Sequence, residues 1–212
     1  VDKNSVLSNE QFPWLSYKNI EIGMCPVKAI RVAYTGELGW ELHHPFEMQN
    51  YLFDKLLEAG KKFNLKLVGA RAQNWLRQEK SYRAFGTELG RDATPLEAGL
   101  DRFIDMKKNF LGKDALKNIS IRSKCVTILL EGPKDADPWG REAIFHNNKK
   151  IGRLTSGGYS VHFKCSIAMG YVSPELAKIG QKVKVKMFDK LWDAKIVEDS
   201  PYDPKNEKIK LD

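Results

Sequence analysis

Six short runs rich in strand-forming residues follow one another between residues 125 and 198. They are CVTILLE (125–131), EAIFH (142–146), IGRLTS (151–156), SIAMGYV (166–172), QKVKVKMF (181–188) and WDAKIVE (192–198). A spacing near ten residues, with Gly, Asn and Pro between the runs, is typical of a small antiparallel barrel or sandwich. We therefore expect an all-β domain at residues 121–212.

Two details sharpen this expectation. Asn147-Asn148 separates two of the runs and predicts a hairpin turn. In QKVKVKMF the residues alternate, which predicts that Val183, Val185 and Met187 face the core and that the lysines between them face solvent. The tail after Pro201 carries no regular pattern, and we expect it to be irregular.

The chain before residue 120 has a different pattern, with helical and strand periods mixed. Residues 19–34 predict two strands joined around Gly23–Pro26, and residues 39–43 predict a third. A helix is expected from Pro45 to Gly60, with Gly60 as its C-cap. These elements indicate an α+β domain at residues 1–120, with a short connection to the β domain near residues 118–124.

Two further helical segments are expected in this first part. One runs from Gly69 to Tyr82, with Ala72, Trp75 and Leu76 turned inward. The other covers residues 94–99, where Thr94 followed three residues later by Glu97 matches the capping-box pattern.

Composition excludes several classes of protein. Among 212 residues no apolar stretch approaches the roughly 20 that a membrane span needs, so no membrane partner is expected. Cys25, Cys125 and Cys165 fit no zinc pattern and indicate a reducing compartment, either the cytoplasm or the mitochondrial matrix. The net charge of +8 would suit a polyanion, but the lysines are scattered and no nucleic-acid motif accompanies them. We expect no nucleic-acid partner.

Metal and hydrolase sites are not indicated either. His43 and His44 are adjacent, so on a strand they point to opposite faces and cannot form one metal site by themselves. His146 and His162 lie in other runs, and the chain has no H-E-x-x-H, no Gly-rich phosphate loop and no G-x-S-x-G elbow.

The segment Tyr34-Thr35-Gly36-Glu37-Leu38-Gly39-Trp40-Glu41 is the unusual local feature. On a strand Glu41 shares a face with Gly39, while Trp40 and Leu42 occupy the other face. Glu41 is then either a surface or salt-bridged carboxylate, or part of a site. Arg71 is its natural partner, because it lies near a helix start, where the helix dipole does not favour a cation.

Four separated blocks resemble one known family, the aminomethyltransferase (glycine-cleavage T-protein) superfamily. They are RVAYTGELGWELHHP (31–45), GARAQNWLRQEKSYRAFGTELGRDATPLEAGL (69–100), NFLGKDAL (109–116) and KKIGRLTSGGYSVHFKCSIAMGYV (149–172). LRQEKSYRAFGTEL (76–89) and DADPWGREAIF (135–145) resemble most the C-terminal folate-binding part of dimethylglycine and sarcosine dehydrogenases. The resemblance implies the C-terminal portion of an α+β folate-binding domain followed by an aminomethyltransferase-type β-barrel.

The resemblance also implies roles for three residues. Tyr34, Glu41 and Arg71 match positions that contact tetrahydrofolate in the family, and we expect Glu41 and Arg71 to converge on one pocket lined by Tyr34. A carboxylate accepts the paired N3–H and 2-amino donors of a pterin, and a guanidinium supplies fixed donors in return. The family's catalytic Asp belongs to a region before this chain, so no catalytic residue is assigned. Arg102-Phe103 stands where many T-proteins carry a Trp.

The function implied is that of a tetrahydrofolate-binding segment of a dimethylglycine or sarcosine dehydrogenase-type demethylase, which forms 5,10-methylenetetrahydrofolate. FAD is expected only in the N-terminal remainder of such a parent protein. That remainder and a small methylated-glycine-type substrate are the expected partners, and this chain alone is expected to be inactive. A glycine-cleavage aminomethyltransferase is the alternative enzyme, and a non-catalytic regulatory or scaffold homologue is the alternative outside enzymes.

Overall fold

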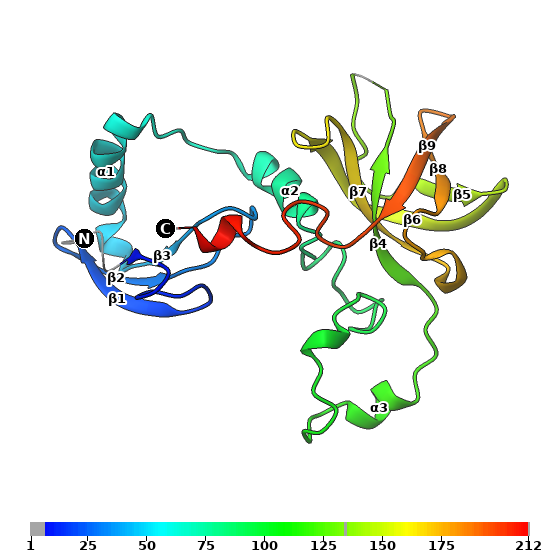
Figure 1. Ribbon diagram of the computed structural model, residues 1–212, viewed down its shortest axis with the longest axis horizontal. Helices are drawn as coiled ribbons and strands as arrows, with labels where there is room; N and C mark the ends of the chain where they lie inside the picture. Colours follow the sequence, from blue (N-terminus) through cyan, green and yellow to red (C-terminus); the bar gives the residue numbers. More distant parts are fainter. Residues whose placement is uncertain (1–6, 134, 212) are drawn as a thin grey trace. The chain divides into compact units, whose positions relative to one another are not determined.

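The computed structural model describes residues 7–133 and 135–211, which pack as two compact units (Figure 1). The first unit is made of Val1–Gln73 together with Lys205–Asp212, and the second of Asn74–Pro204. The boundary between these units differs from the one expected at residue 120. The division into domains 1–120 and 121–212 stays a prediction.

A three-stranded antiparallel sheet forms the base of the first unit. Its strands are β1 (Tyr17–Ile22), β2 (Cys25–Ile30) and β3 (Glu41–His43), in the order β1-β2-β3. Every second residue of β2 is buried, and this apolar row packs with Leu52 of α1 (Gln49–Gly60) and with Phe12. The predicted strands are therefore confirmed, and period-two burial explains why the helix lies against this sheet.

Gly60 does not act as the C-cap that the sequence predicts. A short 3-10 helix, η2 (Phe46–Met48), precedes α1, and a second one, η3 (Lys61–Phe63), continues the chain after it. The left-handed residue that ends this run is Asn64, at φ 55°, whereas Gly60 has a helical φ of −74°. A Cβ atom on Gly60 would lie 2.6 Å from Leu65 Cβ, so glycine is needed there for close packing.

Helix α2 (Ala70–Glu79) is shorter than predicted and buries different residues. Ala72, Trp75 and Leu76 are only half-buried, whereas Arg77, Gln78 and Glu79 are buried. The expected inward face is only partly buried, and the polar C-terminal end of the helix, which the sequence did not single out, is its most deeply buried part. Ser81 has a φ of 54°, a left-handed conformation that stops the helix.

Residues 94–99 form turns and no helix, although the capping interactions are present. Thr94 N donates to Glu97 Oε2 (2.9 Å) and Glu97 N donates to Thr94 Oγ1 (3.2 Å). Gly99, at φ 71°, ends this turn, so the segment does not continue into a second helical turn. The chain continues through η4 (Asp101–Phe103) and α3 (Lys113–Lys117).

A closed six-stranded antiparallel barrel forms most of the second unit (Figure 1). Its strands follow the order β4-β7-β6-β5-β8-β9, and a 3-10 helix, η5 (Pro174–Leu176), lies between β7 and β8. Their bounds are β4 (Lys124–Leu130), β5 (Ala143–His146), β6 (Lys149–Ser160), β7 (Cys165–Val172), β8 (Lys182–Met187) and β9 (Lys190–Val197). All six predicted runs are strands, and a barrel is the correct choice between the two all-β architectures.

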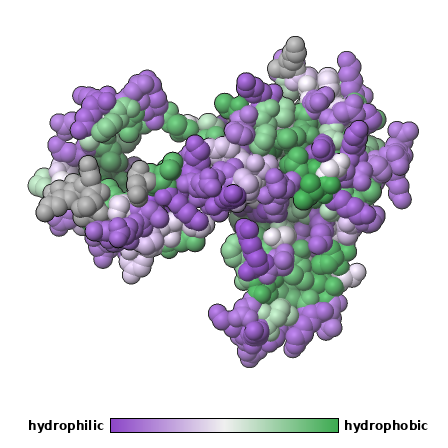
Figure 2. Space-filling model, in the orientation of Figure 1, coloured by the Kyte–Doolittle hydropathy of each residue, from purple (hydrophilic) through white to green (hydrophobic). Residues whose placement is uncertain are grey.

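The smaller predictions for this region are also confirmed. Asn147 and Asn148 have φ angles of 48° and 61°, as a tight two-residue hairpin turn requires. Val183, Val185 and Met187 lie in the barrel core, and the lysines of β8 face outward. Hydrophilic side chains project around the edge of the barrel in Figure 2.

The tail after Pro201 is more ordered than predicted. It ends in η6 (Lys208–Lys210), whose Ile209 is buried in the first unit. Arg31 Nη2 donates to the carbonyl of Leu211 (2.5 Å), so the fully buried Arg31, the residue after β2, holds the tail in place. None of the described helices is both long and apolar enough to cross a membrane.

Candidate functional site

The segment from Tyr34 to Gly39 is a loop between β2 and β3 that depends on two glycines. Gly36 has a φ of 83°, in the left-handed region that glycine adopts without strain. A Cβ on Gly39 would lie 2.7 Å from Ala33 Cβ, so this residue allows the loop to fold back on itself. The loop leaves Tyr34 partly exposed, with 36% of its surface accessible.

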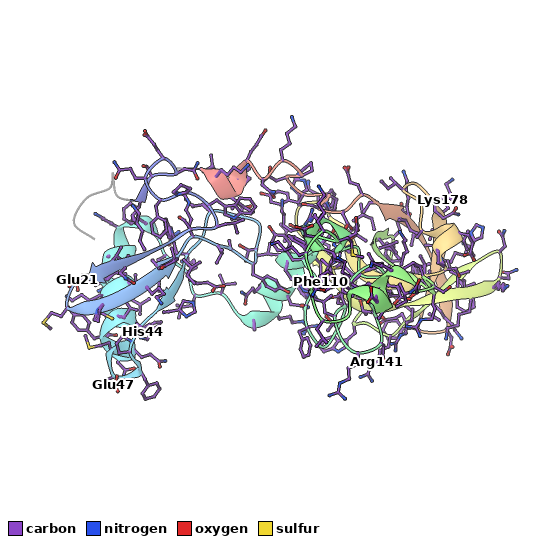
Figure 3. The ribbon with its side chains drawn as sticks, turned by 90° about the horizontal axis from the view of Figure 1, so that it is seen from below. Glu21, His44, Glu47, Phe110, Arg141 and Lys178 are labelled. Atoms are coloured by element: carbon purple, nitrogen blue, oxygen red, sulfur yellow. The ribbon has the colours of Figure 1, made fainter. Side chains whose placement is uncertain are left out.

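Glu41 is the first residue of β3, and its side chain faces solvent. Trp40 and Leu42 pack against the core of the first unit, as the alternation predicts. The Glu41 carboxylate lies 3.4 Å from His43 Nε2, and both side chains are more than half exposed. Such a pair stabilises little, so the carboxylate stays available to a ligand. His44, labelled in Figure 3, contacts the carbonyl of Pro45 instead.

Arg71 is an exposed residue in the first turn of α2. That turn contains no acidic residue, and the helix dipole disfavours a cation at a helix start. Tyr34, Glu41 and Arg71 all belong to the first unit and all reach solvent. The partner that the structure gives Glu41 is His43, and the convergence of Glu41 with Arg71 stays a prediction.

The second unit contains a buried ion pair that the sequence analysis missed. Arg77 Nη1 donates to Glu88 Oε2 (2.7 Å), and neither side chain has any exposed surface. The Glu88 carboxylate also accepts from Thr155 Oγ1, Ser156 Oγ, Thr87 Oγ1 and Ala84 N. Burial alone would raise the pKa of Glu88, but the charge of Arg77 and these donors lower it below its usual value. The pair therefore fastens α2 to β6.

A second buried carboxylate, Glu97, is held by backbone donors. Its Oε1 accepts from Arg122 N (3.0 Å) and its Oε2 accepts from Thr94 N (2.9 Å). Burial opposes ionisation of this group, yet the donors lower its pKa to about 2. The sequence signal that could have identified Arg77 is the density of polar side chains in LRQEKSYR (76–83), which is unusual for a packed helix end.

The three cysteines of the described residues are free thiols. Cys25 and Cys125 are buried, and burial raises the pKa of the Cys125 thiol to about 12. A thiol in that state is no nucleophile. Within the described ranges no group of three or more His, Cys, Asp or Glu residues is arranged to hold a metal ion.

These observations define a class of protein: an α/β binding module with accessible carboxylate, guanidinium and phenol groups, followed by a closed antiparallel barrel. Residues 1–108 match the model described as the GCVT N-terminal domain, and residues 124–203 match the glycine cleavage T-protein C-terminal barrel domain. The chain belongs to the glycine cleavage T-protein family. The resemblance and the fold class inferred from the sequence are confirmed.

Individual relatives agree with this assignment. The chain is 42% identical to mitochondrial dimethylglycine dehydrogenase of Rattus norvegicus over 91% of this chain and 23% of that protein. It is 38% identical to an aminomethyltransferase of Caldanaerobacter subterraneus over 81% of this chain and 46% of the relative. Its fold matches the crystal structure of glycine cleavage system aminomethyltransferase T from Bartonella henselae with a TM-score of 0.74 at 25% identity, covering 83% of this chain and 50% of that one. The chain thus spans about a quarter to a half of the length of these relatives.

Proposed function

We propose that this chain is the tetrahydrofolate-binding segment of a dimethylglycine or sarcosine dehydrogenase-type demethylase that forms 5,10-methylenetetrahydrofolate. The observation that carries the proposal is the 42% identity to a dimethylglycine dehydrogenase across 91% of the chain. Mitochondrial sarcosine dehydrogenase of Mus musculus, 31% identical over 96% of the chain, supports the same class. The names of both relatives also support a mitochondrial location, with the cytoplasm as the alternative.

The exposed carboxylate, guanidinium and phenol groups suit a reduced pterin. Glu41 presents a carboxylate that is not neutralised by a buried cation, and it would accept from the N3–H and 2-amino group of the ring. Arg71 would donate to the ring carbonyl or to an acidic group of the cofactor, and Tyr34 would cover the ring face. When bound, tetrahydrofolate supplies the nitrogen atoms that accept a one-carbon unit. The residues of this chain bind and orient it.

The first prediction tests Glu41 directly. Glu41→Gln removes one charged acceptor, so affinity for tetrahydrofolate should fall about tenfold or more, in line with roughly 1.5–3 kcal/mol for a hydrogen bond to a charged group. Calorimetric titration of the parent enzyme and its variant measures this change. Glu21→Gln, another exposed carboxylate on the same sheet, serves as the matched control and should bind as the wild type does. Equal affinities for the Glu41 variant and the wild type would remove Glu41 from the site.

The aminomethyltransferase alternative rests on the fold match to the Bartonella henselae protein. The two enzymes differ in the reaction that supplies the one-carbon unit. A dehydrogenase-type parent should demethylate dimethylglycine or sarcosine with a flavin, whereas an aminomethyltransferase should need a lipoyl-protein substrate. Assay of the full parent protein with each substrate separates them, and folate binding without either activity would favour a non-catalytic homologue.

A further inference from the structure

Helix α1 carries apolar side chains on more of its surface than the core of the first unit covers. Leu52 and Tyr51 pack in that core together with the sheet. Phe53, Leu56 and Leu57 are not among its members in the described part of the chain. These three residues are spaced by three and four positions, so they share one side of the helix, next to the side that holds Leu52.

This side of α1 is open to solvent. Phe53 is 46% exposed and Leu56 is 37% exposed, whereas Leu52 is only 3% exposed. The apolar surface continues at the end of the helix, because Gly60 lies one turn beyond Leu56 and Leu65 packs closely on it. Leu65 is itself 47% exposed. The outer face of α1 is defined here as Phe53, Leu56, Leu57 and Leu65.

Charged residues border the outer face. Lys55 and Glu58 form an exposed ion pair (3.0 Å) on another side of the helix, and Lys61 follows directly after α1. A helix that contacts a single layer needs one apolar stripe, so a further apolar side indicates a second layer. An exposed apolar patch with a polar rim marks a place where another protein segment packs.

The size of the outer face indicates what kind of segment covers it. Stable interfaces between separate molecules take about 20–30 residues from each partner. The few side chains of the outer face are far below that number, so they do not support association with a second copy of this chain or with another protein. A segment of the same polypeptide needs less area, because the covalent link keeps its effective concentration high.

The lengths of the relatives leave room for such a segment. The chain matches 50% of the Bartonella henselae aminomethyltransferase and 23% of the dimethylglycine dehydrogenase, so at least half of each lies outside the match. We propose that an apolar element from the N-terminal remainder of the parent protein packs on the outer face of α1. The identity of this element rests on the proposed function, which makes the chain a segment of a longer protein. The exposure of the outer face does not rest on it.

Thiol labelling of the parent protein tests this packing. Leu56→Cys introduces a thiol on the outer face, and Lys186→Cys introduces one on the outward side of β8, at a side chain that is 47% exposed, as the matched control. In the parent, iodoacetamide should modify the Leu56→Cys thiol at least about tenfold more slowly than the control, because a thiol under a packed layer is not accessible. In the 212-residue chain the two thiols should react at similar rates. Mass spectrometry of peptides distinguishes them from the native cysteines.

Phe53→Cys repeats the measurement at a second position, which decides the question if Leu56→Cys does not fold. Equal rates for the outer-face and control thiols in the parent would overturn the proposal. Protection already present in the 212-residue chain would also overturn it, since the chain itself, or a second copy where dilution removes the protection, would then cover the face. Labelling involves no folate, so an unprotected outer face would leave the folate measurement on Glu41 untouched.

Discussion

At the scale of single residues, the stability of this chain depends on carboxylates that the fold keeps ionised. The pKa of Glu97 is about 2 against a usual value of 4.5, because its donors bind the charged form more strongly than burial disfavours it. A carboxylate with a lowered folded-state pKa stabilises the protein above its unfolded-state pKa, and loses that contribution as the pH falls toward the folded-state value.

The second prediction follows from the lowered folded-state pKa of Glu97. The free energy of unfolding should decrease as the pH falls from about 5 to 2, and Glu97 should account for at most about 3 kcal/mol of the decrease. In Glu97→Gln this component is absent, so the difference in stability between wild type and variant should shrink across the same window. Urea unfolding at several pH values measures it. A constant difference would contradict the assignment of the titration to Glu97.

The third prediction concerns the buried pair of Arg77 and Glu88. Glu88→Ala leaves an uncompensated guanidinium in the interior, so it should destabilise the second unit by about 3–5 kcal/mol. Asp114→Ala breaks the exposed pair with Lys117 and should cost about 0.5 kcal/mol or less. Hydrogen exchange of the β6 and β7 amides measures both. A Glu88 variant as stable as the Asp114 variant would show that the pair contributes little.

At the scale of elements, the strands were predictable and the helix end was not. The period-two alternation in QKVKVKMF predicts a strand with one face exposed to solvent and the other buried, and β8 has this pattern. The burial of Arg77 and Glu79 at the end of α2 does not follow from a local pattern, because their partners lie outside the helix: Glu88, 11 residues on, for Arg77, and the Ser160 hydroxyl, 81 residues on, for Glu79. Local patterns contain no information about such partners. Likewise, the residue types at Tyr34, Glu41 and Arg71 suggest a site, but a sequence does not give the distances between them.

The fourth prediction tests how α2 packs on the barrel. Gly158→Ala should force Trp75 away from β6 and destabilise the second unit by about 1–3 kcal/mol, as overpacking does. Gly132→Ala is the matched control, since its Cβ would have no neighbour closer than 3.6 Å. Thermal unfolding of both variants gives the comparison. Combining Gly158→Ala with Trp75→Ala should cost less than the sum of the two single changes, and strict additivity would contradict the contact.

At the scale of the whole molecule, the last residues complete the first unit. Ser200 and Tyr202 bond to Ser81 and Glu79 of the second unit, and the chain then returns to the first unit, where Ile209 is buried. Lys210 also lies over the Trp14 ring, at 5.7 Å from its centroid. The tail therefore belongs to the core of the first unit although the barrel separates the two in sequence.

The fifth prediction is that removal of residues 205–212 loosens the first unit and spares the barrel. Without the tail, Arg31 loses the Leu211 carbonyl and the cavity left by Ile209 exposes the surrounding core. Limited proteolysis should cleave within residues 7–73 at least severalfold faster, while barrel fragments persist. Lys205→Ala, at an exposed position of the same tail, should behave as the wild type does. Unchanged cleavage of the truncated chain would show that the tail is dispensable.

The return of the tail to Arg31 has a consequence for biosynthesis. Within this stretch of the chain, the sheet of the first unit is synthesised before the barrel, and residues 205–211, which close its core, are synthesised after the barrel. The strands of the barrel can therefore pair before residues 205–211 are made, whereas the core of the first unit stays open until then. A nonsense codon just before residue 205 would therefore disturb the unit whose sheet was synthesised before the barrel.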